Sequence, residues 1–199
     1  MSRTRDRILA KTVELIDAEP DAVPSMSAVA RATGISRQAL YLHFPDRATL
    51  LLALVEHVDE REGLREAVAT VDAAPDGPAQ VRAWAEMQAR RNPRIAQLAR
   101  ALDQSRHGDD PAATAWRDRT ANRMRAATAI ARRLRREGHL HRSWTTTEAA
   151  TVVWELLSFR VWDDLVNEAR LPPERYVELA TTMVLATLAA PIRRGRRAA

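Results

Sequence analysis

The chain has 199 residues, of which 46% are hydrophobic and 29% are charged, with a formal net charge of +5 and no cysteine. This balance is typical of a folded globular protein of one or two domains, not of a disordered chain. It excludes disulfides, thiolate metal sites and thiol nucleophiles. No apolar run is long enough to span a membrane, and residues 1–7 lack the apolar core of a signal peptide, so we expect a cytoplasmic protein.

The net charge does not by itself indicate a nucleic-acid partner. Residues 1–50 contain seven Lys or Arg and six Asp or Glu, a net charge of +1. Much of the remaining excess belongs to the four arginines between positions 193 and 197. Binding to DNA would therefore depend on where individual charges are placed.

The first predicted element is a helix over residues 4–18, because apolar residues recur at helical spacing from Ile8 to Ile16. The basic residues at its start could reach phosphates or a minor groove, or they could form a frayed, solvated terminus; they are Arg3, Arg5 and Arg7. Pro20 and Pro24 predict a loop after this helix.

Residues 25–44 predict a helix-turn-helix. Ser25 can cap a short first helix, and Ser36 can cap a second. Gly34 lies between them, where the chain must turn with a positive φ. Leu40 points back at the first helix, so polar residues of the second helix remain exposed, as a major-groove reader requires. The alternative is an ordinary helical hairpin with a glycine turn.

The same stretch, about the first quarter of the chain, resembles the N-terminal domain of the tetracycline-repressor-like (TetR) family of bacterial regulators. The matching residues are Val29-Ala30, Gly34-Ile35-Ser36, Ala39-Leu40-Tyr41, Phe44-Pro45 and Leu50-Leu51. The family often has a Gly near position 38 and a Thr near position 39. Because this chain has Gln38 and Ala39 there, we expect its base recognition to differ from that of better-known members.

The expected DNA-contacting residues are Ser25, Ser36, Arg37, Gln38, Ala39, Tyr41, His43 and Arg47. Arg37 can form two hydrogen bonds to guanine, and Gln38 can form two to adenine, although either could instead hold a phosphate. The resemblance implies that Tyr41 and Arg47 contact phosphates. Tyr41 could alternatively lie at the edge of the core.

Helical patterns continue to the end of the chain, with predicted helices at residues 46–68, 78–91, 93–105, 111–136, 146–169 and 173–191. Sustained alternation of period two is absent, so we predict an all-α protein of about nine helices. The short connections favour an antiparallel bundle. The predicted organisation is a three-helix helix-turn-helix domain at 1–48, a ligand-binding and dimerisation domain at 49–192, and a disordered Arg-rich tail at 193–199.

The last two long helices are apolar over wide faces, which some surface must cover. They could be buried in their own bundle, but the resemblance favours a four-helix interface between two copies. The candidate interface residues are Val153, Leu157, Val161, Leu165, Val177, Met183, Val184 and Leu188.

All five tryptophans lie beyond the helix-turn-helix, where the family binds small effectors between helices. The candidate ligand-binding residues are Trp84, Met87, Leu102, Trp116, Met124, Trp154 and Phe159. The plain alternative is that they form core. We expect no metal site and no cofactor, because His107, His139 and His141 lack companions that would complete a ligand set.

The resemblance thus implies a homodimeric transcriptional regulator, a repressor that binds an inverted repeat in double-stranded DNA and is released by an unidentified small-molecule effector. We expect neither membrane association nor enzymatic activity, because the sequence has no nucleophile elbow, phosphate-binding glycine loop or zinc-protease helix. The second hypothesis is a helical ligand carrier or enzyme in which the helix-turn-helix is only scaffold.

Overall fold

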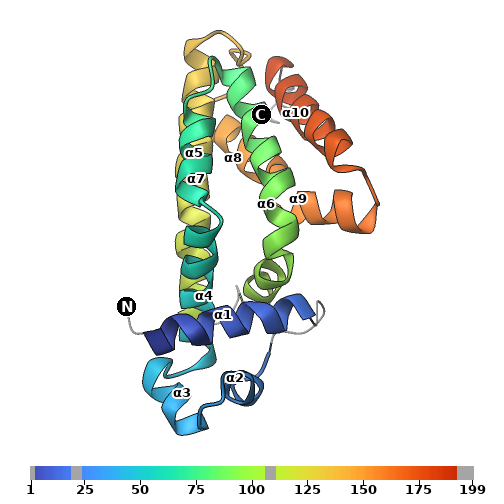
Figure 1. Cartoon of the computed structure of the whole chain (residues 1–199). Helices are drawn as coiled ribbons and strands as arrows, with labels where there is room; N and C mark the ends of the chain where they lie inside the picture. The colour runs from blue at the N-terminus through green and yellow to red at the C-terminus, as the bar shows by residue number, and fades with distance from the viewer. Residues whose placement is uncertain (1–2, 19–23, 106–110, 192–199) are drawn as a thin grey trace, which may run out of the picture. The chain divides into compact units, whose positions relative to one another are not determined.

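The computed structural model describes residues 3–18, 24–105 and 111–191, and all regular secondary structure in these ranges is helical (Figure 1). The all-α prediction is therefore confirmed. The elements are α1 (Arg3–Ala18), α2 (Met26–Thr33), α3 (Arg37–His43), α4 (Arg47–Arg61), α5 (Leu64–Asp72), α6 (Gly77–Ser105), α7 (Pro111–Arg136), α8 (Thr146–Leu156), α9 (Phe159–Asp163), the π-helix η1 (Asp164–Glu168) and α10 (Pro173–Ala189).

The chain divides into two compact units. The N-terminal unit consists of Met1–Arg65 with Arg94–Thr120, and the C-terminal unit consists of Glu66–Pro93 with Ala121–Ala199. The helix-turn-helix expected within residues 1–48 lies wholly in the N-terminal unit. The tail expected at 193–199 lies outside the described residues.

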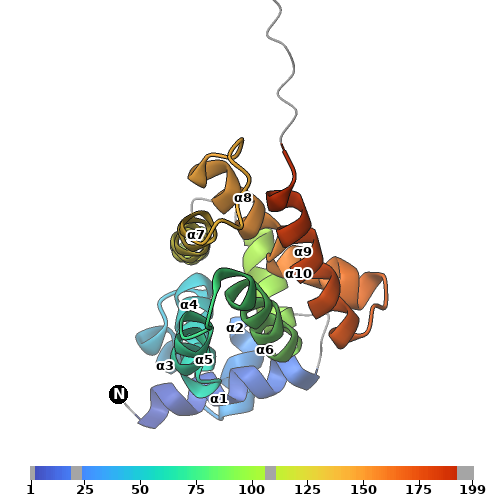
Figure 2. The ribbon, with the colours of Figure 1, turned by 90° about the horizontal axis from the view of Figure 1, so that it is seen from above.

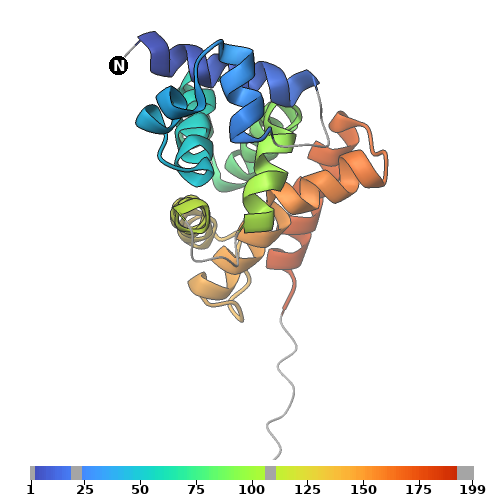
Figure 3. The same cartoon turned by 90° about the horizontal axis from the view of Figure 1, so that it is seen from below.

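The N-terminal unit is built on α1, which packs across α2 and also contacts α4, while α3 packs on α2 (Figure 3). Each of the four helices contributes a fully buried side chain to the core of this unit: Ile8, Val29, Leu40 and Leu54. Burial of each such side chain contributes roughly 1.5–3 kcal/mol. The short helices α2 and α3, of eight and seven residues, would be marginal alone and are stable because they share this core.

Two predicted helix boundaries differ from the structure in the middle of the chain. The helix expected over 46–68 is divided into α4 and α5 at Gly63, whose φ of 63° ends the first helix. Conversely, the break expected before Pro93 is absent, and α6 continues through it. A proline inside a helix costs about 3 kcal/mol. Burial of Met87 and Ile95 on either side offsets this cost.

The helix expected over residues 146–169 is interrupted where a buried side chain forms a hydrogen bond to one of its backbone carbonyl groups. The Gln88 side chain donates a hydrogen bond to the carbonyl of Leu157. Ser158 then starts α9, its Oγ accepting from the Val161 amide at 3.1 Å. Gln88 is held in turn by Tyr176, whose hydroxyl donates to Gln88 Oε1 at 2.9 Å. A tertiary contact with α6 thus ends α8.

In the C-terminal unit, α8 packs beside α10 (Figure 2). The shared core includes Val153 and Leu157 from one side and Val184 and Leu188 from the other, all at most 1% exposed. The start of α6 is attached to α7 by Glu137, which accepts from the Gly77 amide at 2.6 Å and from Arg133 Nε at 2.8 Å. The hydrogen bond from Arg133, followed by that from Gly77, lowers the pKa of Glu137.

Candidate nucleic-acid interface

The turn between α2 and α3 has the geometry that the sequence predicts. Ser25 Oγ accepts from the Ala28 amide at 3.2 Å and caps α2. Gly34 ends α2 with a φ of 68°, and the following Ile35 amide donates to the Ala30 carbonyl at 3.1 Å. This is the left-handed backbone conformation that glycine adopts at little steric cost.

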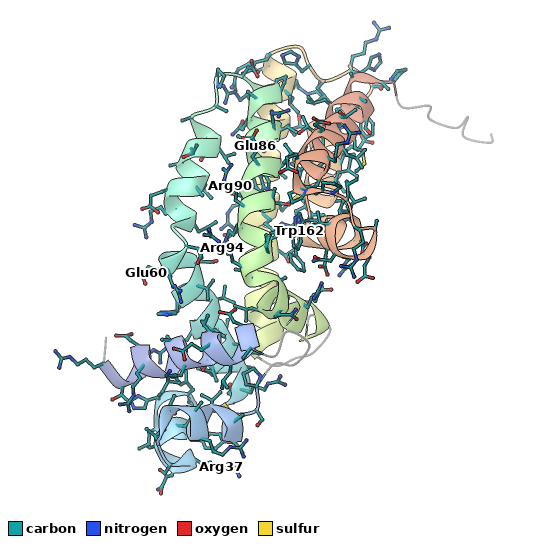
Figure 4. The ribbon with its side chains drawn as sticks, turned by 45° about the vertical axis from the view of Figure 1, so that its right-hand side comes forward. Arg37, Glu60, Glu86, Arg90, Arg94 and Trp162 are labelled. Atoms are coloured by element: carbon teal, nitrogen blue, oxygen red, sulfur yellow. The ribbon has the colours of Figure 1, made fainter. Side chains whose placement is uncertain are left out.

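The helix α3 is held at both ends, so its outer side is presented rigidly. Ser36 Oγ caps it by accepting from the Ala39 amide at 3.1 Å. Leu40 and Phe44, one turn apart, are fully buried. Arg37, Gln38 and Tyr41 of the same helix are exposed, and Arg37 projects away from α1 (Figure 4).

The remaining expected DNA contacts differ in how available they are. Ser25 and Ser36 use their hydroxyl oxygens as helix caps, and both residues lie at the surface. Ala39 and His43 are half-buried. Arg47 is exposed at the first position of α4. The structure thus brings Arg37, Gln38 and Tyr41 onto one helix, but contact of any of these residues with DNA remains a prediction.

The α4 helix begins at Asp46, whose Oδ1 accepts from the Thr49 amide at 2.6 Å. This hydrogen bond lowers the pKa of Asp46. The carboxylate is therefore charged at neutral pH and stabilises the positive end of the α4 dipole.

Two features of this surface escaped the sequence analysis. Leu42 is 82% exposed although it belongs to a helix with a buried face. The spacing of Leu40 and Phe44 was the available signal, because these two residues supply the core contacts of α3 and leave Leu42 outside. Arg5 lies with its guanidinium carbon 4.5 Å from the centre of the Phe44 ring and donates to the His43 carbonyl at 3.2 Å. It therefore fastens α1 to the end of α3 and does not fray into solvent.

The ligand candidates of the C-terminal unit are aromatic and largely covered. Met87 is buried, whereas Trp84, Met124, Trp154 and Phe159 are half-buried. The Arg123 guanidinium lies 5.3 Å from the Trp154 ring and donates to its carbonyl at 2.7 Å. The Phe159 and Trp162 rings are 5.6 Å apart. The side chains of Leu102 and Trp116 lie outside what the structure describes.

The candidate interface residues fall into two groups. Val161, Leu165 and Met183 are half-buried. The other five are already covered by the chain's own helices, so a second copy could not reach them without repacking the core; they are Val153, Leu157, Val177, Val184 and Leu188.

The part of the chain that the structure describes holds neither a metal-binding cluster nor a membrane-spanning helix. Within 3–18, 24–105 and 111–191, no group of three or more His, Asp or Glu side chains is placed to hold a metal ion. Among the same residues, no helix has the length and apolar character needed to cross a bilayer.

Comparison with known proteins gives a family match for the segment that contains the helix-turn-helix. Residues 8–54 match the family model described as bacterial regulatory proteins, tetR family. The nucleoid occlusion factor SlmA of Marinobacter nauticus is 36% identical over 56 residues, which cover 28% of this chain and 29% of that protein. The match therefore spans less than a third of the curated relative.

Solved structures extend the similarity in fold over nearly the whole chain. The TetR family transcriptional regulator PfmR from Thermus thermophilus is 21% identical, with a TM-score of 0.60 over 98% of this chain and 100% of that one. The regulator FadR from Bacillus subtilis, solved in complex with stearoyl-CoA, is 15% identical, with a TM-score of 0.68 over 94% of this chain and 98% of that one. Residues 8–54 thus match the model of the tetR family of bacterial regulatory proteins, and nearly the whole chain has the fold of these solved structures.

Proposed function

We propose that this protein is a DNA-binding transcriptional repressor that acts as a homodimer on an inverted repeat and is released by a small-molecule effector. The observation that carries the proposal is α3, a capped helix that buries Leu40 and exposes Arg37, Gln38 and Tyr41. Arginine and glutamine are the side chains best suited to read guanine and adenine in the major groove.

A dimer is required because one helix of seven residues contacts too few base pairs for a specific site. Two copies related by a two-fold axis would place two α3 helices about 34–36 Å apart, one turn of DNA. The surface proposed for the contact is the side of α10 that faces away from its own core, with Leu179, Met183 and Ala186. These residues are spaced three and four apart and so form one stripe.

The effector proposal rests on the aromatic content of the C-terminal unit and on the likeness in fold to FadR, which was solved with stearoyl-CoA bound. Residues proposed to contact an effector are Trp84, Met87, Trp154 and Phe159. Release requires a ligand that binds better to the state that does not fit the operator. By linkage, operator DNA would then weaken effector binding by the same factor.

The first test is selection of bound DNA from a random duplex library by the purified full-length protein, without added ligand. Enrichment of an inverted repeat with half-sites about one helical turn apart is the expected result. If folded protein enriches no sequence at low salt, there are two explanations. Either the protein needs a co-repressor to bind DNA, or it is a ligand carrier or enzyme in which the helix-turn-helix is only scaffold. Repeating the selection with a cell extract distinguishes these two outcomes.

Variants then separate base reading from phosphate binding. Arg37→Ala is expected to relax the base preference at one position of each half-site, at a cost of about 1–3 kcal/mol for the preferred sequence. Arg47→Ala should weaken all sequences alike and flatten the dependence of affinity on salt. Arg132→Ala, at an exposed arginine of α7, is the control and should change neither. Uniform loss of affinity in both test variants would refute this division of roles.

A further inference from the structure

Among the residues whose side chains the structure describes, Leu42 is the most exposed large hydrophobic one. It is 82% exposed, about twice the value of Tyr41 at 40%, Val68 at 39% or Leu179 at 38%. Single exposed leucines are common on proteins. This one is notable because it lies on α3, the helix whose outer side is otherwise suited to recognise DNA.

The backbone of α3 determines the neighbours of Leu42. Residues four apart lie on the same side of a helix, so Leu42 shares its side with Gln38. Helical side chains lean toward the N-terminus, which directs Leu42 over the turn that carries Gln38. Leu40 and Phe44 are fully buried, so the core needs nothing from Leu42. An amide and an aliphatic side chain therefore lie next to each other on one exposed surface.

In the major groove this pair has a distinct complement. A glutamine amide matches the N6 and N7 edge of adenine, and the thymine C5-methyl is the apolar group that the groove presents. Contact with a methyl group would remove the apolar surface of Leu42 from water, which is favourable in proportion to the area buried.

We propose that Leu42 is a specificity-determining residue that contacts the C5-methyl group of a thymine beside the base read by Gln38. This assignment rests on the proposed function, because it presumes that α3 lies in the major groove. It identifies part of the preferred half-site: a thymine adjacent to, or paired with, the adenine that Gln38 contacts.

The test uses the full-length protein and the duplex obtained by selection. Each thymine of the half-site is replaced in turn, in both halves, by deoxyuridine, which lacks only the methyl group. The wild type should bind the duplex altered at one such position about 15-fold more weakly, since each lost methyl contact is worth about fourfold. Leu42→Ala should bind the thymine and uracil duplexes with equal affinity.

Val68→Ala, at another exposed apolar side chain that lies outside the proposed dimer surface, is the control and should keep the wild-type preference for thymine. Because Leu42 contributes nothing to the core, circular dichroism and the melting temperature of Leu42→Ala should match those of the wild type. If the wild type binds a selected site but does not distinguish uracil from thymine at any position, this assignment is wrong and the proposed function stands. The assignment is also wrong if Leu42→Ala retains the discrimination. Failure of the folded wild type to bind any duplex, both alone and with a cell extract, would overturn both.

Discussion

Among individual residues that the structure describes, Tyr176 is one whose chemistry is strongly altered by burial. Its side chain is fully buried, and its hydroxyl donates to Gln88 Oε1 at 2.9 Å. Burial raises the pKa of the Tyr176 phenol, and the nearby charge of Arg123 only partly opposes this effect. Gln88 uses its amide to hold the Leu157 carbonyl. The phenol therefore supports the junction between α8 and α9 from α10.

We predict that Tyr176→Phe lowers the free energy of unfolding by about 1–3 kcal/mol at neutral pH, because it leaves the buried Gln88 Oε1 unpaired. Above about pH 10 the unfolded tyrosine ionises, whereas the folded phenol stays neutral because its pKa is raised. Above this pH, the free energy of unfolding of the wild type therefore falls by about 1.4 kcal/mol per pH unit through this residue. Tyr176→Phe has no phenol at this position and lacks this loss. Urea denaturation at about pH 9 and pH 11, on either side of the unfolded pKa, should show the difference between them shrinking.

Tyr41→Phe is the control for this experiment, since Tyr41 is exposed and has no role in the core. It should leave the free energy of unfolding unchanged at neutral pH. A difference between wild type and Tyr176→Phe that stayed constant across this pH range would contradict the assigned role of burial.

Among the elements, α3 is a helix whose stability depends on its neighbours. It has seven residues, too few to be stable alone in water. Its N-terminal end is capped by Ser36, and its C-terminal end is covered by Arg5 from α1, which lies over Phe44 and bonds the His43 carbonyl. The orientation of the proposed reading surface therefore depends on α1.

We predict that Arg5→Ala lowers the free energy of unfolding by about 1–2 kcal/mol, through loss of the ring contact and the hydrogen bond to the His43 carbonyl. Arg5→Lys should recover little of this, because an ammonium group lacks the planar surface of guanidinium. Thermal unfolding followed by circular dichroism measures both effects.

The control is Arg7→Ala, two residues along α1, where the side chain is exposed. Its effect on stability should stay within about 0.5 kcal/mol. If Arg5→Ala were as stable as Arg7→Ala, the contact with α3 would contribute nothing, and a direct role for Arg5 at DNA would become the better explanation.

In the whole molecule, the outer stripe of α10 is the proposed surface between two copies. Leu179 is 38% exposed, Met183 is half-buried and Ala186 is exposed, whereas Val184 and Leu188 of the same helix are fully buried. One side of α10 thus stabilises its own unit, and the stripe leaves apolar surface for a partner.

We predict that Leu179→Glu raises the dissociation constant of the homodimer about a hundredfold or more, because the interface would bury an unpaired carboxylate. Sedimentation velocity over a range of concentrations measures the change. Val68→Glu is the matched control, because Val68 of α5 is equally exposed, at 39%, but lies outside the stripe. Equal dissociation constants for both variants and the wild type would exclude this stripe from the interface.

The helix-turn-helix could be predicted from the sequence because its determinants are local. Ser25, Gly34 and Ser36 act on backbone groups within a few residues of themselves, so their identity and spacing specify two caps and a turn. The all-α class followed for the same reason, since the period of apolar residues reports on one helix at a time. The exposure of Gln38 was likewise predictable from the position of Leu40 in the same chain segment, because residues two apart lie on different sides of a helix.

Other features depend on contacts between residues distant in the sequence, and no local pattern contains them. Pro93 would end a helix in isolation, but the burial of apolar residues on both sides keeps α6 continuous. The end of α8 is set by Gln88, 69 residues away from Leu157. Because α8 and α10 have apolar residues on most sides, the spacing of these residues does not indicate which of them are buried in the core. Tertiary packing covered Val153 and Val184 and left Leu179 exposed, because burial depends on which helix lies opposite.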